Sequence, residues 1–465
     1  MLLRERAAAA LLAITALAAS GCINGQSRDI PPGPTAIPPE ASAYVYVAQA
    51  RNQSQGTDGG AVVAYQLGAD GLLPAEPYAS VTAVNPRRLV RHPELPVLYV
   101  ATASQVLAFD ISGGRLRSLC ADGGSAPPCA TAPVPGSNPV DMVFAQNSDG
   151  NYLLYVVERG GGNNLDTLTR VVAYELDTDG GLPSQASSQV QTPNSLSYQG
   201  AAIVMLDLGE GNPPGYAYLA DAGQSNIGRF PLLSDGNLPY PVPTVPVSAT
   251  PTPEPDASPT PSPTQTPVST AWRAANPARM ILGVVPTPIA SPVAEPEPTG
   301  DPSGVEIYVV EQGRRRIGSI PVYVDGNLPK NPAAESNTRG IYNSIAVYPN
   351  PISTVEPLSR IYGAAFQNGQ VDSFLIEADG SIRPDTLSAT FANTSSYPTG
   401  VSILPPIGDG PARLFVSVGG FNRVDEYEIN PDGTLPELPV SSTAAVNDTF
   451  PADVLVYWEV GAGQP

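Results

Sequence analysis

Short apolar runs recur along the chain, and each is built around one aromatic residue with β-branched or leucine neighbours, a pattern typical of strands. The seven central aromatics are Tyr46, Tyr99, Tyr155, Tyr218, Tyr308, Tyr362 and Phe415. Successive aromatics lie about 53 to 63 residues apart, except for one interval of about 90 residues that contains two proline-rich segments. The spacing therefore predicts seven copies of one β-rich unit.

A second signal, an Asp-Gly turn that closes on leucine, follows the aromatic runs. The clear copies are Asp70-Gly71-Leu72, Asp179-Gly180-Gly181-Leu182, Asp235-Gly236-Asn237-Leu238, Asp325-Gly326-Asn327-Leu328 and Asp432-Gly433-Thr434-Leu435, with weaker copies at 113–116 and 379–384. Asp-Gly between apolar runs supplies the positive φ angles of a tight hairpin. Since each unit has room for four short strands, the chain is predicted to be an all-β, seven-bladed β-propeller with four-stranded blades.

The two ends of the repeat region complement each other. A proline introduces the apolar run expected to form the innermost strand of most blades, as at Pro86, Pro139, Pro277 and Pro398. The first copy lacks this run, but a matching one stands at the C-terminus, at Phe450–Trp458. We therefore expect the C-terminal strand to complete the first blade and close the ring, which removes two open sheet edges.

The N-terminus has the features of an export signal. Arg4 and Arg6 precede an apolar stretch that ends in Ser20-Gly21-Cys22, similar to a bacterial lipoprotein signal in which the cysteine is acylated. The alternative is an ordinary signal peptide with an incidental cysteine. The predicted organisation is thus a signal peptide at 1–21, a polar tether at 22–42 and a propeller at 43–465.

Low-complexity composition and charge add further expectations. Pro/Thr/Ser-rich insertions at about 241–270 and 286–304 bury too little apolar surface to fold alone. The formal net charge is −20, from 43 acidic and 23 basic residues, and Lys330 is the only lysine. Such a chain is a poor partner for nucleic acid, whose phosphates demand basic patches.

Two cysteines besides Cys22 stand close together in the sequence. Cys120 and Cys129 are predicted to form a disulfide in one surface loop, because an export compartment is oxidising. Two sulfurs without further ligands make a poor zinc site. We predict neither a metal nor a cofactor.

The combination of a Pro-introduced apolar run, His-Pro, Leu-Tyr-Val and Asp-Gly-x-Leu resembles the seven-bladed lactonase propellers, relatives of bacterial 6-phosphogluconolactonase and of YVTN-repeat surface proteins. The resemblance covers about residues 43–460 apart from the insertions, and it implies that the start of each inner strand faces the channel mouth. Relatives often carry Pro-Arg-His or Pro-His there. This chain has no histidine at those positions, and its single histidine, His92, falls in a turn.

Four charged residues stand at the predicted mouth. Arg88 and Arg279 could hold a carboxylate or phosphate in bidentate fashion. Alternatively, they form salt bridges with Asp141 and Asp453 and plug the channel. In an enzyme, Asp141 or Asp453 would be the general base and the arginines would stabilise an oxyanion.

The sequence favours a binding or scaffolding module, lipid-anchored in the bacterial cell envelope at the outer membrane or cell surface, with a periplasm-facing location as the alternative. Its expected partner is an envelope protein or polysaccharide. The competing function is a lactonase-like hydrolase. A hydrolase needs an open mouth with Asp141 or Asp453 facing it, whereas a module predicts a plugged channel or exposed apolar patches on the rim.

Overall fold

The computed structural model describes the greater part of the predicted propeller. The described residues are 42–51, 59–119, 138–147, 149–158, 170–191, 201–207, 215–221, 225–241, 269–272, 277–284, 302–329, 332–338, 340–349, 359–377, 379–384, 389–390, 396–408, 410–446 and 449–459. The signal peptide, nearly all of the tether and most of both insertions lie outside this part, as do Cys22, Cys120 and Cys129. The expectations for those segments and cysteines therefore remain predictions.

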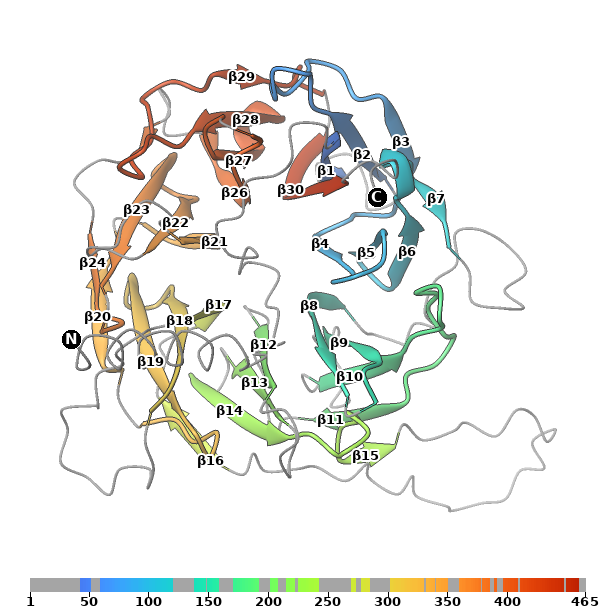
Figure 1. Ribbon diagram of the computed structural model, residues 1–465, viewed down its shortest axis with the longest axis vertical. Helices are drawn as coiled ribbons and strands as arrows, with labels where there is room; N and C mark the ends of the chain where they lie inside the picture. Colours follow the sequence, from blue (N-terminus) through green and yellow to red (C-terminus); the bar gives the residue numbers. More distant parts are fainter. Residues whose placement is uncertain are drawn as a thin grey trace, which may run out of the picture.

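Seven antiparallel blades are arranged in a ring around a common centre (Figure 1), which confirms the predicted all-β, seven-bladed propeller. From the channel outward, the strands are, in blade 1, β30 (Thr449–Glu459), β1 (Ser42–Arg51), β2 (Gly60–Gln66) and β3 (Ala79–Thr82); in blade 2, β4 (Arg88–Arg91), β5 (Val97–Ala101), β6 (Val106–Asp110) and β7 (Arg117–Ser118); in blade 3, β8 (Pro139–Gln146), β9 (Tyr152–Glu158), β10 (Arg170–Glu175) and β11 (Ser188–Gln191); in blade 4, β12 (Ala201–Asp207), β13 (Gly215–Asp221), β14 (Asn226–Pro231) and β16 (Ser269–Trp272); in blade 5, β17 (Pro277–Val284), β18 (Pro302–Glu311), β19 (Arg316–Tyr323) and β20 (Ala334–Asn337); in blade 6, β21 (Tyr342–Pro349), β22 (Ser359–Ala365), β23 (Gln370–Ile376) and β24 (Ile382–Pro384); and in blade 7, β26 (Pro398–Leu404), β27 (Arg413–Val418), β28 (Arg423–Glu428) and β29 (Ser441–Ser442).

A few short elements add to this plan. Blades 3 and 6 each carry one extra short strand, β15 (Tyr240–Pro241) beside β11 and β25 (Ala389–Thr390) beside β23. Two single-turn 3-10 helices, η2 (Ser112–Gly114) and η4 (Gly419–Phe421), stand in connections. The short elements leave the four-stranded blade as the repeating unit.

The ring closes as the sequence predicts. The C-terminal strand β30 pairs with β1, the first described strand of the chain, from Ser42 opposite Glu459 to Arg51 opposite Thr449. The innermost strand of blade 1 therefore comes from the opposite end of the chain to its other three strands.

A hydrogen bond between blades explains why the aromatic and the Asp-Gly turn recur together. At four junctions the buried tyrosine hydroxyl of one blade donates to the carbonyl of the turn glycine in the next blade. The pairs are Tyr99 with Gly180, Tyr218 with Gly326 and Tyr362 with Gly433, each at 2.6 Å, and Tyr155 with Gly236. These glycines have φ between 73° and 83°, which residues with a Cβ rarely adopt. The repeat thus encodes the contact between blades as well as the hairpin within each.

The junction between blades 5 and 6 is built differently. Glu306 on β18 is fully buried, and its Oε2 accepts a 2.6 Å hydrogen bond from the Ser319 hydroxyl. Its Oε1 has no hydrogen-bond partner among the described residues, and it lies where a Cβ on Gly380 would come within 3.0 Å. Burial raises the pKa of Glu306 to about 8, so this carboxyl is protonated at neutral pH.

Candidate functional site

The inner strands carry β-bulges near their first residues, and these bulges aim the next side chain. In β8, β17, β21 and β26 the register shifts between the first residue of the strand and the third, and in β30 it shifts between Pro451 and Asp453. A bulge places two residues opposite one and changes the direction of the side chain that follows it. Asp141, Arg279 and Asp453 each stand directly after such a bulge.

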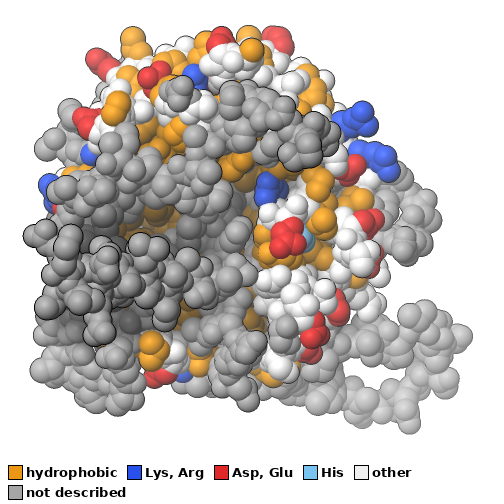
Figure 2. All heavy atoms as spheres, in the orientation of Figure 1, with side chains coloured by type: hydrophobic (Ala, Val, Ile, Leu, Met, Phe, Trp, Pro, Cys, Tyr) orange, Lys and Arg blue, Asp and Glu red, His pale blue; other side chains and the backbone are white. Residues whose placement is uncertain are grey.

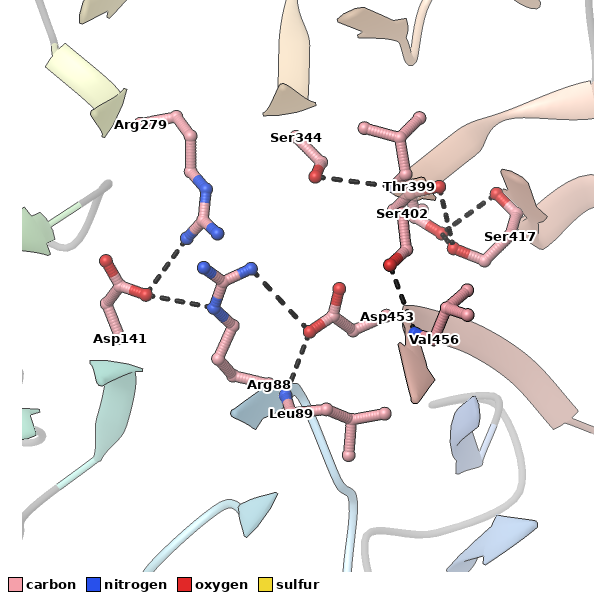
Figure 3. Close-up of polar contacts among 12 residues, drawn as sticks. Arg88, Leu89, Asp141, Arg279, Ser344, Thr399, Ser402, Ser417, Asp453 and Val456 are labelled. Carbon is pink, nitrogen blue, oxygen red and sulfur yellow. Dashed lines mark hydrogen bonds and ion pairs between the residues drawn. The ribbon is translucent and has the colours of Figure 1, made fainter. Parts of the chain in front are cut away.

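These three residues and Arg88 converge in the channel as one ionic cluster, which we call the channel ring (Figure 3). Asp141 Oδ1 lies 3.0 Å from Arg88 Nε and 2.9 Å from Arg279 Nη1. Arg88 Nη1 lies 3.7 Å from Asp453 Oδ2. All four side chains are at least nine-tenths buried, and their formal charges sum to zero.

The aspartates of the channel ring also bind the backbone of the neighbouring blade. Asp141 Oδ2 accepts a 3.1 Å hydrogen bond from the Ile203 N–H in blade 4, and Asp453 Oδ2 accepts one of 2.9 Å from the Leu89 N–H in blade 2. Ser344 accepts a similar hydrogen bond, from the Val401 N–H in blade 7 (Figure 3). The position after the bulge therefore fastens inner strands of adjacent blades.

His92 has a structural position in the turn after β4. It is buried, and its Nδ1 accepts hydrogen bonds from the backbone N–H groups of Glu94 and Leu95, at 3.1 and 3.0 Å. Burial, with a smaller contribution from Arg91, lowers the pKa of His92 to about 4. Its ring therefore stays neutral at physiological pH and stabilises the turn.

A cavity of about 420 Å³, which we call the mouth pocket, lies where blades 7, 1 and 2 meet. Its lining includes Arg51, Asn85, Arg87 and Phe450. The sequence-based reasoning passed over Arg51 and Arg87. The usable signal is the Arg87-Arg88 pair, of which Arg88 joins the channel ring and Arg87 lines the pocket.

The charged side chains visible on the described part of one face are spread around the rim (Figure 2). Acidic groups lie at many points of that rim instead of gathering in one field. In the part of the chain that the structure describes, no group of three or more His, Cys, Asp or Glu residues could hold a metal ion. No helix among those residues has the length and apolar character needed to cross a membrane.

The fold is similar to that of solved seven-bladed propellers, among them proteins described as a 6-phosphogluconolactonase and a gluconolactonase. A candidate 6-phosphogluconolactonase from Bacteroides fragilis superposes with a TM-score of 0.55 and 14% identity, over 90% of this chain and 98% of that one. The periplasmic gluconolactonase PpgL of Pseudomonas aeruginosa gives a TM-score of 0.52 and 15% identity, over 90% and 99%. A protein from Lactobacillus plantarum gives 0.52 and 12%, over 90% and 100%.

The sequence comparisons give no closer assignment. No protein-family model matches the chain, and no curated protein matches it. Likeness at 12 to 15% identity establishes the fold, while activity depends on the residues of the site.

Proposed function

We propose that this chain is a non-catalytic binding module of the lactonase-like propeller fold, exported and lipid-anchored through Cys22, which binds an envelope polysaccharide or protein. The observation that carries the proposal is that both carboxylate oxygens of Asp141 already accept hydrogen bonds from the protein itself. Its Oδ1 accepts from Arg88 and Arg279, and its Oδ2 accepts from the Ile203 backbone. A carboxylate between two guanidiniums is held in its charged form and is a weak proton acceptor.

The other candidate base is also engaged. Asp453 Oδ2 faces Arg88 and the Leu89 N–H, and the side chain is buried. Both arginines that an oxyanion would need already have Asp141 as a partner. Such a cluster, neutral overall and with its charges paired internally, favours a structural role in which the four side chains plug the channel. A plugged channel is what we expect of a binding module.

The rim and the point where the tether joins the ring support the same function. Leu438 and Val440, in the segment before β29, are 71% and 44% exposed, so apolar side chains are available on the rim. The described chain begins at Ser42, which lies opposite Glu459, at the end of β30 away from the channel ring. A lipid at Cys22 would then hold that end toward the membrane and leave the mouth facing away from it.

The competing function is a lactonase-like hydrolase, and the names of the structural neighbours favour it. One experiment separates the two. The full-length chain in detergent is incubated with gluconolactone and 6-phosphogluconolactone in a pH-stat and, in parallel, with isolated envelope polysaccharide. We expect the polysaccharide to be retained and lactone opening to proceed at the uncatalysed rate. Saturable lactone hydrolysis that is lost in Asp141→Asn and kept in the exposed control Asp149→Asn would overturn the proposal.

A further inference from the structure

The mouth pocket is assembled from the seam where the two ends of the chain meet. Arg51 stands at the end of β1, Arg87 directly before β4, and Phe450 near the start of β30. Nine described residues line the pocket, and none of them is acidic. The chain has 43 acidic and 23 basic residues, whereas the described residues that line this cavity include two arginines and no acidic residue.

Arg87 carries a charge that no described carboxylate balances. Its Nη1 donates to Asn138 Oδ1, which is a neutral amide oxygen. Burial lowers the pKa of Arg87, and no neighbouring acid opposes that effect. The adjacent Arg88 is the internal comparison, because it is buried against Asp141 and Asp453. A half-buried guanidinium in this state gains stability when an anion binds it.

Arg51 adds a second cation on the solvent side. It is exposed and forms no ion pair among the described residues. Two such groups at one cavity suit a planar carboxylate, which guanidiniums bind through paired N–H donors. Because Arg51 is exposed and Arg87 is half-buried, an anion that binds here would meet Arg51 first and would lose its water where it contacts Arg87.

Part of the lining is formed by a close contact between blade 7 and blade 1. The ring of Phe450 lies against Gly419, where an added Cβ would come within 2.2 Å of the ring, so only glycine allows this contact. With the Asn422 amide turned so that its nitrogen faces the neighbouring carbonyls, that nitrogen donates to Gly419 O at 2.8 Å and to Thr449 O, which would tie the turn of blade 7 to β30. The lining of the pocket therefore combines two guanidinium groups with one aromatic ring, and the Phe450–Gly419 contact fixes the position of that ring.

We propose that the mouth pocket binds a carboxylate-bearing sugar residue of an acidic polysaccharide. The carboxylate lies between Arg51 and Arg87, and the C–H face of the sugar ring packs on Phe450. The volume of about 420 Å³ is within the range of small-ligand sites and excludes a folded partner. This inference rests on the proposed binding function and names the chemistry that the module recognises.

The test is calorimetric titration of the full-length chain in detergent. The probes are polygalacturonate, free glucuronate and neutral dextran. We expect polygalacturonate to bind, glucuronate to bind more weakly at the same site, dextran not to bind, and added salt to weaken the interaction. Arg51→Ala and Arg87→Gln are each expected to lower affinity for polygalacturonate about tenfold or more, since each removes a charge-assisted hydrogen bond.

Arg117→Ala is the matched control, because Arg117 is an exposed arginine on β7 outside the pocket. It is expected to bind as the wild type does. Arg51→Ala removes an exposed side chain, so loss of folding cannot account for its effect. Three results would each overturn the inference. In the first, dextran binds as well as polygalacturonate, and in the second, glucuronate binds but polygalacturonate does not. In the third, Arg51→Ala and Arg87→Gln bind polygalacturonate as well as Arg117→Ala does. Retention of an envelope polysaccharide in those cases would leave the proposed function standing, whereas lactone turnover lost in Asp141→Asn would remove the function itself.

Discussion

The buried carboxyl at the junction of blades 5 and 6 gives a sharp stability prediction. Glu306 is fully buried, one of its oxygens accepts from Ser319, and the other has no partner among the described residues. Because burial raises its pKa to about 8, the folded protein keeps a proton that the unfolded chain releases near pH 4.5. Glu306→Gln keeps the size and neutrality of the protonated group and does not titrate.

The magnitude follows from linkage between protonation and folding. Between pH 4.5 and about 8 the unfolded chain binds fewer protons at this site than the folded one, so the free energy of unfolding falls as pH rises. The slope is about 1.4 kcal/mol per pH unit for one group. At neutral pH the wild type has therefore lost about 3 kcal/mol that Glu306→Gln retains.

Urea unfolding of the wild type and of Glu306→Gln at about pH 5 and pH 7.5 measures the difference. We expect the two proteins to be similar at the lower pH and to differ by about 3 kcal/mol at the higher one, with Glu306→Gln the more stable. Glu437→Gln, at an exposed position, should follow the wild type at both values. The same pH dependence in the wild type and in Glu306→Gln would refute the reasoning.

Three further outcomes are expected. Tyr99→Phe removes the 2.6 Å hydrogen bond to Gly180 and should lower the free energy of unfolding by about 1 to 3 kcal/mol. Tyr397→Phe, at an exposed position, should leave that free energy unchanged. Equal effects of the two substitutions would argue against a stabilising role for the tyrosine-to-glycine hydrogen bond between blades. Asp141→Ala leaves two buried guanidiniums without their shared partner and should lower the free energy of unfolding by about 3 to 5 kcal/mol. An unchanged melting temperature would show that the channel ring does not stabilise the fold. Cys22→Ser should abolish fatty-acid labelling and release the protein from membranes, and continued labelling would exclude this cysteine as the anchor.

The sequence predicted the architecture because its signals are local and repeated. Each aromatic run and each Asp-Gly turn reports a hairpin independently, and the seven copies together specify a ring. The C-terminal closure was predictable for a related reason: one copy lacks its inner strand, and a matching run at Phe450–Trp458 lacks a partner.

The contents of the site were less accessible from sequence. Arg88, Arg279, Asp141 and Asp453 were named as candidates from the sequence, but whether they pair with one another depends on distances across four blades. Arg87 and Arg88 are adjacent in the sequence, yet Arg88 joins the channel ring and Arg87 lines the mouth pocket, a difference in side-chain direction that has no clear sequence signal. The hydrogen bond from the tyrosine of one blade to the turn glycine of the next could likewise not be predicted, because the sequence pattern describes each copy separately.

The shared first blade also sets an order of events in synthesis. Strands β1 to β3 are made before the strands of the other blades, yet the strand that occupies the inner side of their sheet, β30, is made after blade 7. Until then β1 presents an open edge, and blade 7 lacks the contacts that its strands β26 and β27 make with β30. The ring therefore becomes complete only after β30 has been synthesised, and a chain cut short before Thr449 keeps the four strands of blades 2 to 7 but lacks the inner strand of blade 1.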